Sequence, residues 1–126
     1  MPVTVKELLA QADAAVPRIT HAEAKEMLAN GGAVIVDVRD SAEIRASGKV
    51  RGAIHIPRGS LEFKADAATS YHDKNLLPDR PVILYCAAGA RAALAGKALK
   101  DMGYAKVFNL GAFKDWAEAG EAVDPA

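Results

Sequence analysis

One short stretch of the chain combines the residue types that nucleophilic chemistry requires. Cys86 follows an apolar run, Val82 to Tyr85, and four small residues separate it from Arg91. The run predicts a buried strand, and the small residues predict a tight loop that opens a helix. The first N–H groups of a helix lack intrahelical partners and carry the positive end of the helix dipole. Because they stabilise an anion, we expect the Cys86 thiolate to be a usable nucleophile near neutral pH.

The loop predicts a cradle whose walls are backbone. Its small residues let several amides converge on one concavity, and Gly89 can take the positive φ that such a curl requires. Arg91 is expected to hold a second anion beside the sulfur. The alternative is that Cys86 is a small buried hydrophobic residue. With Cys86 as the catalytic residue, the predicted substrate-binding residues are Ala87, Ala88, Gly89, Ala90 and Arg91.

The segment Cys86-Ala-Ala-Gly-Ala-Arg91 resembles the active-site loop of the rhodanese (sulfurtransferase) superfamily. In that family the cysteine begins a loop that cradles a persulfide or an incoming anionic sulfur donor. The related cell-cycle phosphatases, arsenate reductases and tyrosine phosphatases have one residue more between cysteine and arginine. A shorter loop encloses a smaller space, which suits a sulfur atom better than a tetrahedral phosphate. This count argues against phosphatase chemistry.

A second apolar run, Ala33 to Val38, contains the carboxylate of Asp37. A carboxylate inside an apolar strand needs a partner, and Arg39 projects from the same side two residues later. An Asp-x-Arg ending of this strand is typical of the rhodanese family, and the resemblance places it close to the active-site loop. We therefore expect Asp37 and Arg39 to support the loop by an ion pair or hydrogen bonds rather than to contact substrate.

The resemblance extends to Val50-Arg-Gly-Ala-Ile-His-Ile-Pro57, although Ala53 stands where the family usually has a histidine. Within it, the stretch from Ala53 to Ile56 predicts a brief central strand. His55 is a candidate catalytic base, but an activated thiolate needs no base. The sequence leaves open whether His55, Tyr71 or His72 reaches the pocket.

Short buried strands that alternate with helical patterns predict an α/β fold whose central, mostly parallel sheet has helices on both faces. The resemblance implies that this fold is a single rhodanese-like domain. Ligands of such sheets bind beyond the carboxyl ends of the strands, where Cys86 and Arg39 both fall. The resemblance covers about Ile19 to Gly120. We expect an N-terminal helical extension over residues 1–16, without an assigned role, and the rhodanese-like domain over residues 17–126.

Local signals predict several further elements. Asp40-Ser-Ala-Glu43 is a capping-box pattern that opens a short helix. Ser60 is expected to cap a helix that runs to about Ala68. The run from Lys106 to Gly111 predicts the last strand, and Glu121 to Ala126 predicts a frayed tail.

The composition limits the kinds of partner and of cellular compartment that suit this chain. The 126 residues suit one domain, and the sixteen basic and sixteen acidic side chains cancel, so charge implies neither nucleic acid nor a membrane surface as a partner. The single cysteine excludes an internal disulfide and a multi-cysteine metal cluster, and a reducing compartment suits a free thiol. No leader pattern or membrane-length apolar run is present, so we expect a cytoplasmic protein. The displacement chemistry predicted for Cys86 needs no metal or organic cofactor.

Together these features predict a double displacement through a Cys86 persulfide. A sulfane sulfur would pass from an anionic donor, thiosulfate by default, to cyanide or a thiol. The main alternative is a persulfide carrier or sulfur-relay module, which takes sulfur from a protein donor and turns over poorly with small molecules. Arsenate or phosphate-ester chemistry and an inert scaffold are the remaining alternatives.

Overall fold

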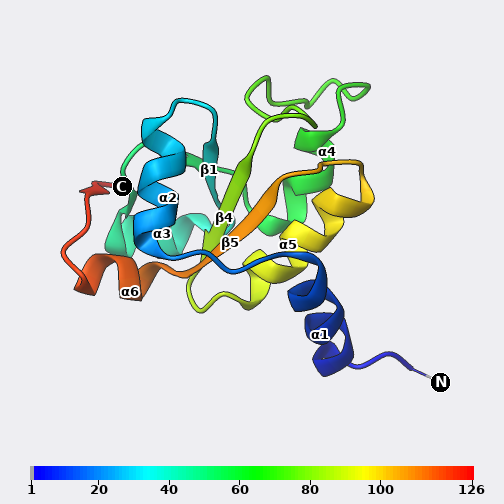
Figure 1. Ribbon diagram of the computed structural model, residues 1–126, viewed down its shortest axis with the longest axis horizontal. Helices are drawn as coiled ribbons and strands as arrows, with labels where there is room; N and C mark the ends of the chain where they lie inside the picture. Colours follow the sequence, from blue (N-terminus) through cyan, green and yellow to red (C-terminus); the bar gives the residue numbers. More distant parts are fainter. Residues whose placement is uncertain (1) are drawn as a thin grey trace.

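The computed structural model describes residues 2–126 and contains a parallel sheet between two layers of helices (Figure 1). The strand order is β3-β1-β4-β5. The strands are β1 (Val34–Asp37), β3 (Ile54–His55), β4 (Val82–Cys86) and β5 (Val107–Ala112). This arrangement confirms the predicted α/β class. The central position predicted for the strand near His55 is wrong, because the two fully buried strands, β1 and β4, occupy the middle of the sheet and leave β3 at its edge.

Helices cover both faces of the sheet (Figure 1). On one side lie α1 (Val5–Ala15), α4 (Leu61–Ala65), which follows the 3-10 turn η1 (Arg58–Ser60), and α5 (Ala90–Asp101). On the other side lie α2 (His21–Ala29), α3 (Ser41–Ser47) and α6 (Phe113–Glu118). Alternation along β4 supplies both cores: Leu84 and Cys86 face the α5 layer, whereas Tyr85 faces α2 and α6. The thiol therefore lies on the α5 side of the sheet.

The N-terminal helix α1 is packed against α5 rather than projecting from the domain. Ala12 and Val16 are almost fully buried. The two segments approach closely because Gly96 has no side chain: a Cβ at Gly96 would lie 2.8 Å from both Val16 methyl groups. The proposed division of the chain after residue 16 stays a prediction.

The helix that was expected to run from Ser60 to about Ala68 is shorter than predicted. It ends at Ala65, and Ser60 makes no side-chain capping hydrogen bond. The Asp66 carboxylate accepts a hydrogen bond from the Ala68 N–H at 2.8 Å. This local bond holds the chain in a turn and stops the helix.

The prediction of a frayed tail is also wrong. Strand β6 (Val123–Asp124) pairs antiparallel with β2 (Lys49–Val50). The Trp116 indole N–H donates to the Ala122 carbonyl at 2.9 Å, which anchors the tail to α6. Strand β6 could not be predicted from its own short sequence, because its partner β2 lies far away along the chain.

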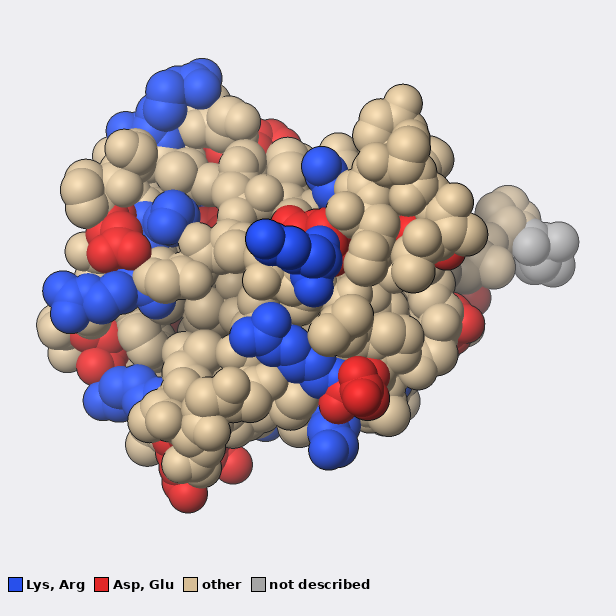
Figure 2. Space-filling view, turned by 90° about the horizontal axis from the view of Figure 1, so that it is seen from above, with Lys and Arg blue, Asp and Glu red and all other residues tan. Residues whose placement is uncertain are grey.

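The surface carries both signs of charge. Acidic and basic side chains lie next to one another across the face in Figure 2. Oppositely charged side chains also form ion pairs, such as Lys97 with Asp101 on α5 at 2.8 Å. Within residues 2–126 no helix is both long enough and apolar enough to cross a bilayer.

Candidate active site

Cys86 ends β4, and its sulfur meets the backbone at the start of α5. Sγ accepts hydrogen bonds from the N–H groups of Gly89, at 3.0 Å, and Ala92, at 3.4 Å. Gly89 precedes the helix with a φ of +104°, a conformation that glycine adopts at little cost. Cys86 is only 1% exposed. Two amide donors and the positive end of the α5 dipole thus converge on the sulfur, an arrangement that stabilises a thiolate.

Asn109 holds the loop from β5, a contact that the sequence interpretation missed. Its side chain is almost fully buried, and its Nδ2 donates to the Gly89 carbonyl at 3.1 Å. Its Oδ1 accepts from the Gly111 N–H at 2.8 Å. Both ends of the side-chain amide are used, so Gly89 is fixed where its own N–H meets the sulfur. An asparagine inside an apolar strand was the available signal, since a buried amide needs partners.

Arg91 lies in the first turn of α5 and forms a bidentate ion pair with Glu43 of α3. Nη1 and Nη2 of Arg91 lie 2.7 and 2.8 Å from the two carboxylate oxygens. The hydrogen bonds from Arg91 lower the pKa of Glu43 to about 2. In turn Glu43, with a smaller contribution from Cys86, raises the pKa of Arg91. Glu43 is a second residue that the sequence interpretation missed as part of this site.

Asp37 and Arg39 form the predicted ion pair, and it is buried. Arg39 Nη2 lies 2.7 Å from Asp37 Oδ2, and Nε lies 3.0 Å from Oδ1. The guanidinium also lies 4.3 Å from the centre of the Phe113 ring. Asp37 is in register with Tyr85, whose ring belongs to the core beneath α2 and α6. The pair therefore lies on the face of the sheet opposite the Cys86 sulfur.

A path from Arg39 to the loop runs through α3. The Arg39 guanidinium donates to Ser47 Oγ at 2.9 Å and to the Gly48 carbonyl at 2.7 Å, at the C-terminal end of α3. Glu43 of the same helix binds Arg91. The buried pair thus positions α3, and α3 positions Arg91.

The other polar residues considered from the sequence have partners elsewhere. His55 Nε2 lies 2.7 Å from the Arg39 carbonyl, and His72 Nε2 lies 2.9 Å from the Leu76 carbonyl. Tyr71 lines a cavity that contains no residue of the Cys86 loop. The other residues lining that cavity are Ser60, Phe63 and Lys64. Among the described residues, the side chains of His55, Tyr71 and His72 form no hydrogen bond with the loop.

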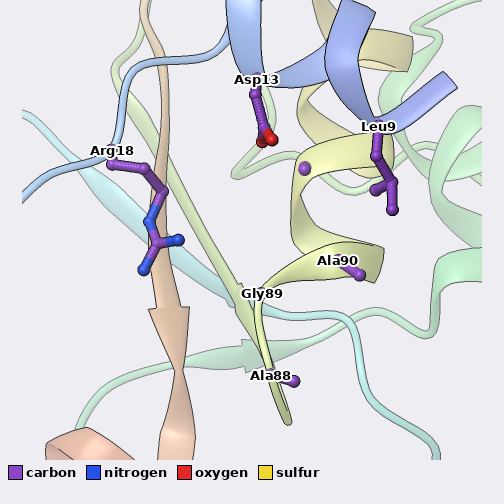
Figure 3. A pocket seen from close by; sticks show the side chains of 7 residues that line it. Leu9, Asp13, Arg18, Ala88, Gly89 and Ala90 are labelled. Atoms are coloured by element: carbon purple, nitrogen blue, oxygen red, sulfur yellow. The ribbon is translucent and has the colours of Figure 1, made fainter. Parts of the chain in front are cut away.

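A cavity of about 190 Å³ lies against the loop, between it and α1 (Figure 3). It is lined by Leu9, Asp13, Arg18, Ala88, Gly89, Ala90 and Ala93. The Arg18 guanidinium occupies the space where a Cβ of Gly111 would lie, and a Cβ at Gly89 would be 3.6 Å from Arg18 Nη1. No local pattern in the sequence indicates that the Arg18 side chain reaches the loop.

A family model for the rhodanese-like domain matches residues 20–119, so the chain belongs to the rhodanese-like family. This confirms the resemblance inferred from the Cys86 loop. The human thiosulfate:glutathione sulfurtransferase is 32% identical over 112 residues, which cover 83% of this chain and 96% of that protein.

Solved structures share the fold along nearly the whole chain, α1 included. A Rhodopseudomonas palustris protein of unknown function, described as a possible tyrosine phosphatase, gives a TM-score of 0.87 at 34% identity and covers 98% of this chain and 99% of its own. The polysulfide-sulfur transferase homodimer of Wolinella succinogenes gives a TM-score of 0.77 at 31% identity, with 96% and 87% covered. At the family level, the human and Wolinella succinogenes proteins support sulfurtransferase activity.

Proposed function

We propose that this protein moves a sulfane sulfur from an anionic donor to a thiophilic acceptor through a persulfide on Cys86. The observation that carries the proposal is the pair of amide hydrogen bonds, from Gly89 and Ala92, that converge on Sγ at the start of α5. They favour the thiolate, the form of cysteine that attacks sulfur.

The first half-reaction uses thiosulfate as the default donor. The Cys86 thiolate attacks the outer sulfur, so that a new bond forms between Sγ and that sulfur. The sulfur–sulfur bond of thiosulfate breaks, and sulfite leaves with its electron pair. The residues proposed to bind the donor and the departing anion are Ala87, Ala88, Gly89, Ala90 and Arg91.

In the second half-reaction, cyanide or a thiolate attacks the outer sulfur of the persulfide. A carbon–sulfur or sulfur–sulfur bond forms, the bond to Sγ breaks, and the Cys86 thiolate is restored. Neither half-reaction requires a metal or an organic cofactor, because the nucleophile and the leaving groups carry all the charge that moves.

Arg91 contributes to donor binding in this proposal, with Glu43 as its counter-ion. We expect Arg91→Ala to lower kcat/KM for thiosulfate by about 10- to 1,000-fold, the effect of removing a cation from a developing anion. Asp37 and Arg39 act indirectly, through α3. A change below about threefold for Arg91→Ala in steady-state assays would remove Arg91 from this role.

The decisive test is the intact mass of the protein after brief incubation with thiosulfate. We expect the gain of one sulfur atom, its loss on addition of cyanide, and no gain in Cys86→Ala. A folded protein whose thiol alkylates rapidly but gains no sulfur would favour the alternative, a carrier that receives sulfur from a protein donor.

The description of the Rhodopseudomonas palustris relative as a possible tyrosine phosphatase concerns that protein. Only four residues separate Cys86 from Arg91 in this chain, and the short loop favours sulfur over phosphate. Rapid hydrolysis of an aryl phosphate by the wild type, lost in Cys86→Ala, would reverse this preference. A cytoplasmic location stays a prediction.

A further inference from the structure

The cavity between α1 and the active-site loop is lined by two opposite charges. Figure 3 shows the Asp13 carboxylate and the Arg18 guanidinium both extending toward the loop. The volume of about 190 Å³ is below the roughly 300–1,000 Å³ of pockets for drug-sized ligands, so the cavity suits a small charged group.

The backbone holds Arg18 in place beside the loop. The Ile19 N–H donates to the Asn109 carbonyl at 3.1 Å, and the Asn109 N–H donates to the Pro17 carbonyl at 2.9 Å. Arg18 is thereby paired with Asn109 of β5, the residue whose side chain fixes Gly89. The arginine is exposed, but its main chain is anchored.

The charges of Asp13 and Arg18 are unmatched within the described part of the chain. Neither side chain forms an ion pair there. The other two arginines around the site are matched, Arg39 by Asp37 and Arg91 by Glu43. A ligand beside the loop would therefore find in Arg18 a guanidinium that no carboxylate of residues 2–126 neutralises.

We propose that Asp13 and Arg18 form a subsite for the zwitterionic amino-acid group of a thiol acceptor. Arg18 would bind the carboxylate with its planar fork of donors, and Asp13 would bind the ammonium group. A dianion such as thiosulfate would be repelled by Asp13, so the subsite fits the acceptor better than the donor. The inference rests on the proposed sulfurtransferase function and assigns the class of its acceptor.

Transfer of the sulfur to such an acceptor is a displacement at the outer sulfur of the Cys86 persulfide. The acceptor thiolate attacks the outer sulfur of the Cys86 persulfide and forms a new sulfur–sulfur bond. The bond between that sulfur and Sγ breaks, its electron pair stays on Sγ, and the products are the acceptor persulfide and the Cys86 thiolate. No external oxidant or reductant takes part.

The kinetic test compares thiol acceptors that carry different charges. The enzyme is first converted to the Cys86 persulfide with thiosulfate. Arg18→Gln should lower the ratio of kcat/KM for cysteine to that for 2-mercaptoethanol by about tenfold or more, the effect of losing a charged hydrogen bond. Arg18→Gln should also impair 3-mercaptopropionate, whereas Asp13→Asn should impair cysteamine. The matched control is Arg51→Gln, on a side chain that is 72% exposed, which should leave the ratio unchanged. An equal effect of Arg18→Gln on all four thiols would overturn the proposal.

A binding test separates this inference from the proposed function, since it needs no turnover. S-methylcysteine carries the same zwitterion but has no thiol to react. We expect it to shift the amide resonances of Gly89 and Ala90 in the wild-type protein and not in Arg18→Gln. Shifts without any persulfide formation would overturn the proposed function and would leave an amino-acid binding site without the role of an acceptor subsite. The absence of shifts at millimolar ligand would overturn the subsite alone.

Discussion

At the residue scale, the site depends on contacts that hold the loop from Cys86 to Arg91 in one geometry. Asn109 fixes Gly89, and Gly89 donates to the Cys86 sulfur. Glu43 fixes Arg91 with both carboxylate oxygens. A side chain that only orients another one is still needed, because hydrogen-bond donors stabilise a thiolate only when they are already aimed at it.

The pair between Glu43 and Arg91 predicts a pH-dependent part of the stability. The pKa of Glu43 is lowered from 4.5 to about 2, so its contribution is present above about pH 4.5 and is lost as the pH falls toward 2. Each side chain is about one third exposed, and solvent screening reduces the contribution to about 1 kcal/mol. Glu43→Gln should lower the free energy of unfolding by this amount at pH 6, and the difference should shrink at pH 3.

Urea denaturation of both proteins at the two pH values checks the prediction. Glu118→Gln is the matched control, because its contact with Lys114 is longer, at 3.8 Å, and more exposed. A difference for Glu43→Gln that stays constant between pH 6 and pH 3 would show that the ion pair is not its source.

At the element scale, α5 connects the Cys86 loop at its first turn with the α1 segment that packs on its middle. Its first turn supplies the amides and Arg91, while its middle packs against the chain that follows α1. The close approach at Gly96 sets how α1 lies on α5, and α1 carries Asp13 toward the loop. The absence of a side chain at Gly96 thus helps to determine where Asp13 lies in the cavity beside the Cys86 loop.

This packing predicts that Gly96→Ala is destabilising although alanine favours helices. The new Cβ would lie 2.8 Å from both methyl groups of Val16, which is itself buried. Such overpacking typically costs about 1–3 kcal/mol, against a gain of about 1 kcal/mol from helix propensity. The second change Val16→Ala should recover most of the loss. Thermal unfolding of the two single variants and the double variant measures the coupling, and simple additivity would contradict the model of a clash.

At the scale of the whole molecule, the C-terminal segment ties the layer of α2 and α6 together. The Lys25 ammonium of α2 lies 2.9 Å from Glu121, and the Trp116 indole of α6 donates to Ala122. Strand β6 then covers β2, where Val50 is buried. The segment that looked like a polar tail is a clasp across three elements.

Removal of residues 121–126 should therefore destabilise the protein by about 1–3 kcal/mol, chiefly because the partly buried indole N–H of Trp116 loses its acceptor. The same truncation should cost less in a Trp116→Phe background, which has no such donor. Chemical denaturation of the four proteins completes the cycle. An unchanged midpoint after truncation would show that the clasp carries no stability.

The parts of the fold and site that the sequence predicted are those encoded locally. The apolar runs of β1 and β4 indicate buried strands, and Asp37 and Arg39 are only two residues apart. The loop after Cys86 was likewise contained in six consecutive residues. Neighbouring residues can be paired by periodicity alone.

The contacts that the sequence did not reveal join residues far apart along the chain. Glu43 lies 48 residues from Arg91, and Asn109 lies 20 residues from Gly89. Finding them requires the strand order and the register of the sheet, which no local pattern specifies. Arg18 was missed for the same reason, because its neighbour Gly111 belongs to the far strand β5.

The chain contains a single cysteine, and that thiol is almost fully buried. No resolving thiol of this chain can attack a persulfide or a sulfenic acid on Cys86, so neither species can collapse to an internal disulfide. Under the proposed function, the lifetime of a sulfur stored on Cys86 would therefore be set by the arrival of an outside acceptor. Repair of an oxidised Cys86 would have to come from outside in the same way, which would make the supply of reduced thiols a condition for repeated turnover.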